Sequence, residues 1–226
     1  MNEVEISKNI TQEDILTHAD LQKSDLLVKD IVKKGVETFH HHYHIIYVLS
    51  KLLDRTFKLY VELGCYLGGS LLLASFAGGP QTKFCAIDTM VCPNQELTLN
   101  NNLKKFYSDI SNFQLIKSST NDRKTISLIK DISEKSDGID ILFIDASHTY
   151  KDVIYDFQTY FPYVRTGGFC IFDDYQSIPC VKAAVDKLIH DHSNVLNVIG
   201  SIPNTVDSHA LYSLKGLNNT FIVQKK

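Results

Sequence analysis

Short apolar runs alternate with longer amphipathic stretches along this 226-residue chain from residue 57 onward. Short apolar runs bounded by turn residues are typical of strands. The run at 139–144, Ile-Asp-Ile-Leu-Phe-Ile, is almost wholly apolar, as expected of a parallel strand that helices cover on both faces. The pattern predicts strands at 57–63, 82–87, 113–116, 139–144, 168–172, 195–199 and 220–224.

The stretches between these runs fit helices. Strands that alternate with helices are typical of an α/β fold with a mostly parallel sheet. Pro179 suits the first turn of the last predicted helix, where its missing N–H costs no hydrogen bond. The predicted helices cover 70–76, 96–108, 119–135, 151–161 and 179–190.

The two ends of the chain carry weaker patterns. Residues 1–54 are predicted to be a helical N-terminal extension before a single domain at 55–226, and residues 201–216 fit either a strand or a short helix. The extension contains four histidines between His40 and His44. Consecutive helical residues point about 100° apart, so we expect surface or substrate contacts here rather than a metal site.

Composition and charge narrow the functional classes. The chain is 44% hydrophobic and 22% charged, which is typical of a soluble globular protein, and a net charge of −3 favours neither nucleic acid nor anionic membrane as a partner. It has neither a signal peptide nor a run of ~20 apolar residues, so we expect a cytoplasmic protein. Five cysteines without C-x-x-C spacing predict neither disulfides nor zinc. A small-molecule substrate is expected, and the oligomeric state stays open.

Glycines cluster directly after the first predicted strand, in the segment Val-Glu-Leu-Gly-Cys-Tyr-Leu-Gly-Gly-Ser at 61–70. A strand that turns through glycines into a helix offers backbone N–H groups to a small polar ligand. Dinucleotide sites need a second glycine two residues after the first, and Tyr66 occupies that position here. Glu62 would repel a pyrophosphate but attract a cationic group. The segment therefore favours S-adenosylmethionine, whose ammonium and sulfonium are positive, over NAD.

The pattern E-L-G-x-Y-x-G-x-S at 62–70 resembles the first motif of class I S-adenosylmethionine-dependent methyltransferases, especially the catechol type of O-methyltransferase. The resemblance implies a Rossmann-like sandwich with a seven-stranded, mostly parallel sheet that contains one antiparallel strand. It also implies that the N-terminal extension packs across the mouth of the site as a lid. The alternative is an ordinary glycine-rich turn in an α/β domain. The candidate cofactor residues in this motif are Glu62, Gly64, Tyr66, Gly68 and Ser70.

Polar residues also follow the second and third predicted strands. In an open α/β sheet, ligands bind beyond the carboxyl ends of the strands. Asp88 ends the second strand, and its carboxylate can accept both hydroxyls of a ribose. Ser119 follows the third strand and can either contact the adenine edge or cap the next helix. Both residues are candidates for cofactor binding.

Carboxylates follow the fourth and fifth predicted strands, at Asp145 and at the pair Asp173 and Asp174. Like charges this close raise one another's pKa unless a cation neutralises them. Oxygen ligands favour Mg²⁺, with Mn²⁺ or Ca²⁺ as alternatives, over zinc. In a competing interpretation, Asp174 caps the following helix or turn and Asp145 only accepts backbone N–H groups.

The combination of Asp145-x-x-His148, Gly167-Gly168 and the run Phe-Asp-Asp-Tyr at 172–175 resembles metal-dependent O-methyltransferases that act on sugars and other natural products. The resemblance spans about residues 57–176. It implies that Asp145, Asp173 and Asp174 hold Mg²⁺ and that His148 is the general base. Catechol-type enzymes carry lysine at that position. The alternative for His148 is a histidine satisfied at a helix start.

Together these features predict a Mg²⁺-dependent enzyme that transfers a methyl group from S-adenosylmethionine to a hydroxyl of a small molecule, such as a sugar or a glycosylated natural product. Catechols and amines are alternative substrates. Two other classes compete with this interpretation. A nucleotide-dependent oxidoreductase is disfavoured by Tyr66, and a non-catalytic methyltransferase-like binding module is disfavoured by the intact acidic set.

Overall fold

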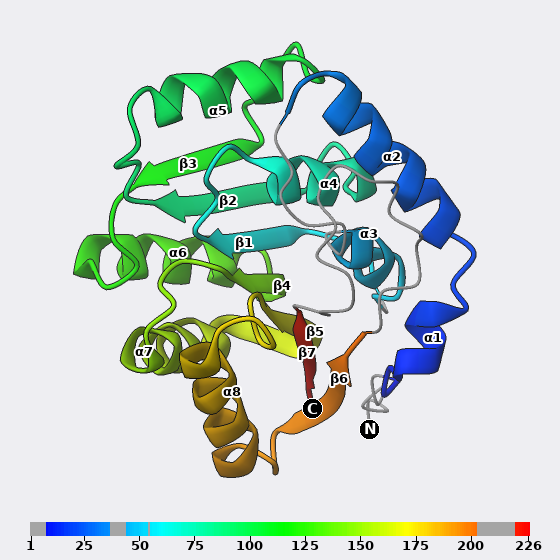
Figure 1. Cartoon of the computed structure of the whole chain (residues 1–226), viewed down its shortest axis with the longest axis vertical. Coiled ribbons are helices and arrows are strands. Elements are labelled where there is room, and N and C mark those ends of the chain that lie inside the picture. The colour runs from blue at the N-terminus through cyan, green and yellow to red at the C-terminus, as the bar shows by residue number, and fades with distance from the viewer. Residues whose placement is uncertain (1–7, 37–43, 54, 203–219) are drawn as a thin grey trace.

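A single seven-stranded sheet forms the centre of the molecule (Figure 1). The computed structural model describes residues 8–36, 44–53, 55–202 and 220–226. Within these residues the strand order is β3-β2-β1-β4-β5-β7-β6, and only β7 runs antiparallel to its neighbours. The predicted mostly parallel sheet with one antiparallel strand is therefore confirmed. Its strands are β1 (Leu59–Leu63), β2 (Lys83–Asp88), β3 (Phe113–Lys117), β4 (Ile139–Ile144), β5 (Val164–Phe172), β6 (Leu196–Ser201) and β7 (Phe221–Lys225).

Two apolar clusters cover the two faces of the sheet. Alternate residues of each strand point to opposite faces. One cluster packs Tyr60 and Phe143 against the helices α2 to α5, and the other packs Val61 and Leu142 against α6 to α8. Every residue of β1 and β4 is buried, as predicted for a strand covered on both sides. These helices are α2 (Leu21–Lys33), α3 (His44–Lys51), α4 (Gly69–Ala77), α5 (Gln95–Lys104), α6 (Arg123–Lys135), α7 (Tyr150–Tyr160) and α8 (Pro179–Asp191).

The N-terminal segment packs into the same core as the sheet. It contributes α1 (Gln12–Leu16), α2 and α3, and residues 45–49 of α3 are fully buried in the cluster that also holds α4. The buried Gln224 side chain of β7 accepts from the Ile10 amide at 2.9 Å and donates to the Lys8 carbonyl at 3.1 Å. The segment is thus fastened to the last strand, and its role as a lid stays a prediction.

Several boundaries differ from the sequence-based prediction. Helix α6 begins at Arg123 rather than at 119, because the Asp122 side chain caps it by accepting from the Lys124 and Thr125 amides. Strand β5 begins at Val164, four residues early, since Val164 already pairs with Ile139 before a register shift. The ambiguous stretch at 203–216 and the side chains of the His40–His44 cluster lie outside the described residues.

The cysteines and the helix lengths bear on two other expectations. All five cysteines are free, and Cys65, Cys85 and Cys170 are buried among apolar side chains. In the part of the chain that the structure describes, no helix combines the length and the apolar character needed to cross a membrane.

A close backbone contact at Gly64 joins the carboxyl ends of β1 and β4. Gly64 has a left-handed backbone (φ +81°), and a Cβ atom placed on it would lie 2.1 Å from the Asp145 carbonyl oxygen. On the other side, the Gly64 amide donates to the Ile87 carbonyl at 2.8 Å. Any larger residue would force these strand ends apart, because no real Cβ contact is that short.

Gly64→Ala should therefore destabilise the protein more than other glycine substitutions do. Gly35 shares the positive φ (+69°) but has open space around it, and Gly79 has open space without a positive φ. A left-handed alanine costs roughly 1–2 kcal/mol, so Gly35→Ala should lose about that much and Gly79→Ala almost nothing. Chemical denaturation of the three variants measures the series. Equal losses of unfolding free energy in Gly64→Ala and Gly35→Ala would mean that the contact with the Asp145 carbonyl is unimportant.

Candidate active site

The loop after β1 surrounds a buried carboxylate. Glu62 is 0% exposed and accepts a hydrogen bond from the hydroxyl of Ser70, in the first turn of α4. Gly68 caps this helix in a left-handed conformation (φ +83°). The predicted strand, glycine turn and helix are thus present, with Glu62 beneath the N-terminus of α4.

Burial raises the pKa of the Glu62 carboxyl to about 8. The nearby negative charge of Asp145 adds to this rise, and the hydrogen bond from Ser70 opposes it. A carboxyl in this setting holds its proton at neutral pH until a positive charge approaches. Once that proton leaves, Glu62 carries the negative charge that can pair with a cationic ligand group.

Asp88 binds backbone amides of the glycine loop, residues 64–68 between β1 and α4. Its Oδ2 accepts from the amides of Cys65 (3.0 Å) and Tyr66 (2.9 Å), and its Oδ1 accepts from the Met90 amide (2.7 Å). Tyr66 adopts a positive φ of 42°, and its side chain is 41% exposed. Asp88 also lines a cavity of about 220 Å³ with Gly64 and Ser119. The predicted contact with a ribose remains a prediction.

Ser119 lies in the loop between β3 and α6. The alternative in which it caps the next helix is wrong, because Asp122 takes that role. Ser119 instead lines the 220 Å³ cavity together with Thr120 and Ser147. This position is compatible with its predicted contact to an adenine.

Two buried amide side chains that the sequence analysis missed hold the glycine loop from α5. Gln95 donates to the Tyr66 carbonyl at 3.2 Å, and Asn102 donates to the Leu67 carbonyl at 3.0 Å. Both residues are buried, at 4% and 3% exposure. Their spacing of seven places them on one face of the helix, which is the signal that could have marked them.

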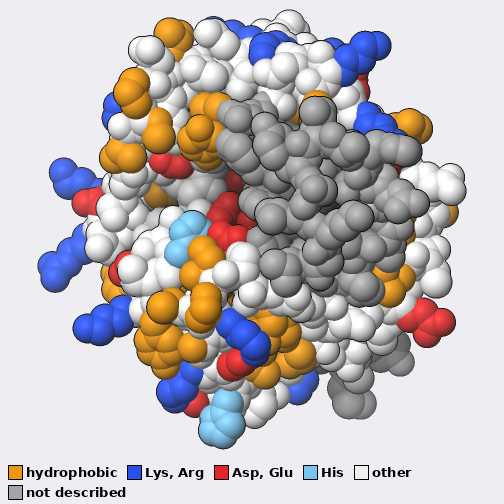
Figure 2. All heavy atoms as spheres, viewed as in Figure 1, with side chains coloured by type: hydrophobic (Ala, Val, Ile, Leu, Met, Phe, Trp, Pro, Cys, Tyr) orange, Lys and Arg blue, Asp and Glu red, His pale blue; other side chains and the backbone are white. Residues whose placement is uncertain are grey.

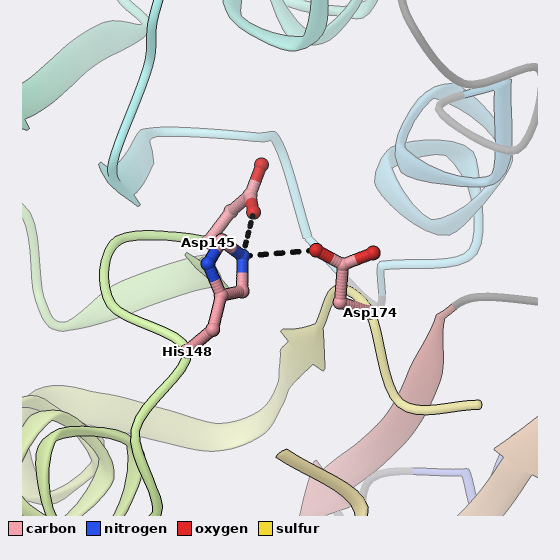
Figure 3. A group of neighbouring side chains, drawn as sticks. All are labelled: Asp145, His148 and Asp174. Carbon is pink, nitrogen blue, oxygen red and sulfur yellow. Dashed lines mark ion pairs between the residues drawn. The ribbon is translucent and has the colours of Figure 1, made fainter. Parts of the chain in front are cut away.

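The carboxyl ends of β4 and β5 bring Asp145, His148 and Asp174 together (Figure 3). His148 Nε2 lies 2.9 Å from Asp174 Oδ2 and 3.6 Å from Asp145 Oδ1. The three donor atoms lie within 4.8 Å of one another. Figure 2 shows acidic side chains and a histidine gathered beside a hollow near the centre of this face. His148 is therefore engaged with both aspartates rather than satisfied at the start of a helix.

The two aspartates change the protonation of His148. Polar contacts with the carboxylates of Asp145 and then of Asp174 raise the pKa of its imidazole to about 10, although partial burial opposes the rise. The imidazole is therefore charged at neutral pH and neutralises part of the acidic cluster. A group that stabilises one positive charge so strongly is suited to a bound cation.

Asp173 lies apart from this trio. Its side chain is buried (3% exposed), and its amide donates to the Ile144 carbonyl at 3.1 Å, which extends the pairing of β4 and β5. Neighbouring residues at a strand end point to different sides of the chain. Among the described residues, the compact group of possible metal ligands therefore contains His148 in place of Asp173. The predicted ligand role of Asp173 remains a prediction.

Comparison with known sequences gives two matches. The family described as a methyltransferase domain matches residues 61–175. An uncharacterized protein of Acanthamoeba polyphaga mimivirus is 36% identical over 198 residues, which cover 83% of this chain and 88% of that protein.

Comparison with solved structures finds the same fold. An O-methyltransferase from Bacillus cereus in complex with SAH has a TM-score of 0.63 at 11% identity, covering 96% of this chain and 98% of that chain. The methyltransferase MycE from the mycinamycin biosynthetic pathway, in complex with Mg, SAH and mycinamycin VI, has a TM-score of 0.54 at 18% identity. That match covers 92% of this chain and 55% of MycE. At these identities the likeness is one of fold.

Glu62→Gln should change how the stability of the ligand-free protein depends on pH. The folded carboxyl keeps its proton up to a pKa of about 8, whereas the unfolded carboxyl loses it near 4.5. The wild type therefore loses stability between pH 4.5 and 8, and the non-titrating variant does not. The unfolding free energy of the variant relative to wild type should rise from pH 5 to 8 in denaturation curves.

Asp156→Asn is a matched comparison for this experiment. Burial raises the pKa of Asp156 to about 6, so the relative stability of that variant should stop rising near pH 6. If the unfolding free energy of Glu62→Gln relative to wild type did not change between pH 5 and 8, the raised pKa of Glu62 would be contradicted.

Proposed function

Because the chain belongs to the methyltransferase-domain family, we propose that it transfers a methyl group from S-adenosylmethionine to a hydroxyl of a small molecule with the help of a divalent cation. The membership confirms the resemblance to methyltransferases in the motif at 62–70. The observation that carries the proposal is the cluster of His148, Asp145 and Asp174 at the edge of the sheet that also bears Glu62.

The methyl donor is proposed to lie on the loop after β1. Glu62 pairs with the ammonium of the donor, and this pairing draws the proton from a carboxyl whose pKa is raised by burial. The backbone of Gly64, Tyr66 and Gly68 and the Ser70 hydroxyl complete the support. Asp88 accepts the ribose hydroxyls, and Ser119 faces the adenine in the cavity that both residues line.

A divalent cation is proposed to bind Asp145, Asp173 and Asp174. The fit rests on chemistry: all three side chains are oxygen donors, and two of them, Asp145 and Asp174, stabilise positive charge strongly enough to raise the pKa of His148 to about 10. Oxygen donors suit Mg²⁺, with Mn²⁺ or Ca²⁺ as alternatives. MycE, with the same fold, was solved with Mg bound, which supports this proposal.

His148 is proposed to be the general base. A bound Mg²⁺ supplies Lewis-acid stabilisation of the substrate oxygen as it loses its proton. His148 can accept that proton only as a neutral imidazole, and its contacts with Asp145 and Asp174 keep it charged in the ligand-free protein. When both carboxylates are engaged by a cation, the pKa of the imidazole falls towards its usual value near 6.5. The histidine is then ready to take the proton onto Nε2.

The proposed substrate is a sugar or a glycosylated natural product, with catechols as the second choice. Histidine at position 148 resembles the sugar-modifying relatives, whereas the catechol type carries lysine there. The complex of MycE with mycinamycin VI is compatible with this class. An amine nucleophile needs no metal to become reactive, so it fits the acidic cluster less well.

A methyl-transfer screen against glycans and phenols, with Mg²⁺ or with EDTA, tests the reaction. We expect formation of SAH from S-adenosylmethionine only with Mg²⁺ and a hydroxyl acceptor. Asp174→Ala should abolish this metal-stimulated transfer and spare cofactor binding, because Asp174 lies on the metal side of the site.

Asp30→Ala, which removes a surface carboxylate paired with Lys34, is the matched control and should behave as wild type. Normal metal binding by Asp174→Ala in calorimetry would refute the ligand assignment. Cofactor and metal binding without transfer to any acceptor would indicate a binding module.

His148→Gln should reduce turnover by about 10²–10⁴-fold with little change in cofactor affinity, since general bases contribute about that much. The variant should also fail to release the proton that wild type releases when it binds metal. At pH 8, metal binding to wild type should release close to one proton, because His148 changes from charged to neutral. Calorimetry in buffers of different ionisation enthalpy measures this release. If His148→Gln turned over at the wild-type rate at pH 7, His148 would not be the general base.

A further inference from the structure

The corner after β5 has a backbone that must be held in place. Asp174 adopts a left-handed conformation (φ +57°), which aspartate enters more readily than most residues when its side chain makes a local hydrogen bond. Such conformations persist where surrounding contacts determine them, and they cluster at functional sites. Residues that follow Asp174 contact both its side chain and its carbonyl.

Ser177 contacts the Asp174 side chain directly. Its hydroxyl donates to Asp174 Oδ1 at 2.8 Å, and the Ile178 amide donates to the Asp174 carbonyl at 3.0 Å. The other carboxylate oxygen, Oδ2, faces His148 at 2.9 Å. The hydrogen bond from Ser177 thus sets the rotation of the carboxylate and turns Oδ2 towards the cluster.

This serine does not serve the helix that follows. Helix α8 begins at Pro179, and its N-cap residue, Ile178, makes no side-chain capping bond. A serine this close to a helix start commonly caps it. The hydroxyl of Ser177, an exposed residue, instead binds the carboxylate of Asp174.

Tyr175, which follows Asp174, is anchored on both sides. The Tyr175 ring packs against Phe221 of β7 with centroids 4.5 Å apart. Its hydroxyl donates to Asp186 at 2.6 Å and accepts from Lys182 at 3.0 Å. Both partners belong to α8, so the corner is fixed between that helix and β7. Ser177 therefore contacts Asp174 at a corner that Tyr175 anchors to α8 and β7.

We propose that Ser177 is a positioning residue for Asp174 as a metal ligand. The inference rests on the proposed function, because it assumes that Asp174 binds a divalent cation. Hydrogen bonds that orient ligating carboxylates typically change metal affinity 10–100-fold when they are removed. Sequence alone gives only the weak signal of a serine three residues after an aspartate.

Titration of Mn²⁺ into metal-free protein, followed by calorimetry, tests the proposal. Ser177→Ala should bind Mn²⁺ about 10–100-fold more weakly, with S-adenosylmethionine affinity unchanged. Ser177→Thr, which restores the hydroxyl, should regain most of the affinity. In turnover, Ser177→Ala should need more metal for half-maximal rate and approach the wild-type kcat at saturation, which a purely structural defect would not produce.

Ser133→Ala is the matched control, because it removes a serine hydroxyl that donates to the Lys130 carbonyl on α6, far along the chain from the corner. It should bind Mn²⁺ as wild type does. Wild-type affinity in Ser177→Ala, with affinity lost in Asp174→Ala, would overturn this inference alone. Wild-type affinity in both variants would overturn the metal site and this inference with it.

Discussion

The contact between Gly64 and the Asp145 carbonyl is the constraint on which the site depends. It fixes the ends of β1 and β4 so closely that no side chain fits between them. The glycine loop follows one strand and the acidic cluster follows the other, so their distance is set by backbone rather than by flexible side chains. A donor on the loop and an acceptor at the cluster would meet with little freedom. Alignment of reacting groups is a large part of the catalytic advantage in such transfers.

The site also gathers several carboxyl groups whose negative charge must be balanced. Glu62 lies near the end of β1, and Asp145 and Asp174 follow the neighbouring strands β4 and β5. The protein tolerates these carboxyls by holding protons: on Glu62, whose pKa is raised by burial, and on His148, whose pKa is raised by two carboxylates. Each proton occupies a place where a cationic ligand is proposed to bind. Ligand binding would then exchange one positive charge for another, which costs less than creating a charge in a buried site.

The fold was largely predictable because apolar runs such as 139–144 identify buried strands without any tertiary information. The site residues were predictable as far as they lie at or just after the carboxyl end of a strand, which holds for Glu62, Asp145 and Asp174. Gln95 and Asn102 were missed, since polar residues on a helix normally face solvent and only the folded chain shows a loop above them. The cap at Asp122 was missed for a related reason, because several polar residues before α6 suit a cap equally well.

The packing of Tyr175 on Phe221 has a consequence for the order in which the chain acquires its parts. Strand β7 follows the other strands and the helices described in the chain, yet it is inserted between β5 and β6 and supports the corner that carries Asp174. The glycine loop, Asp88 and α5 are complete more than a hundred residues earlier. During synthesis on the ribosome, the half of the site that is proposed to hold the methyl donor can thus be assembled well before the acidic half. A nascent chain that lacks β7 also lacks the Phe221 ring that packs on Tyr175 beside Asp174.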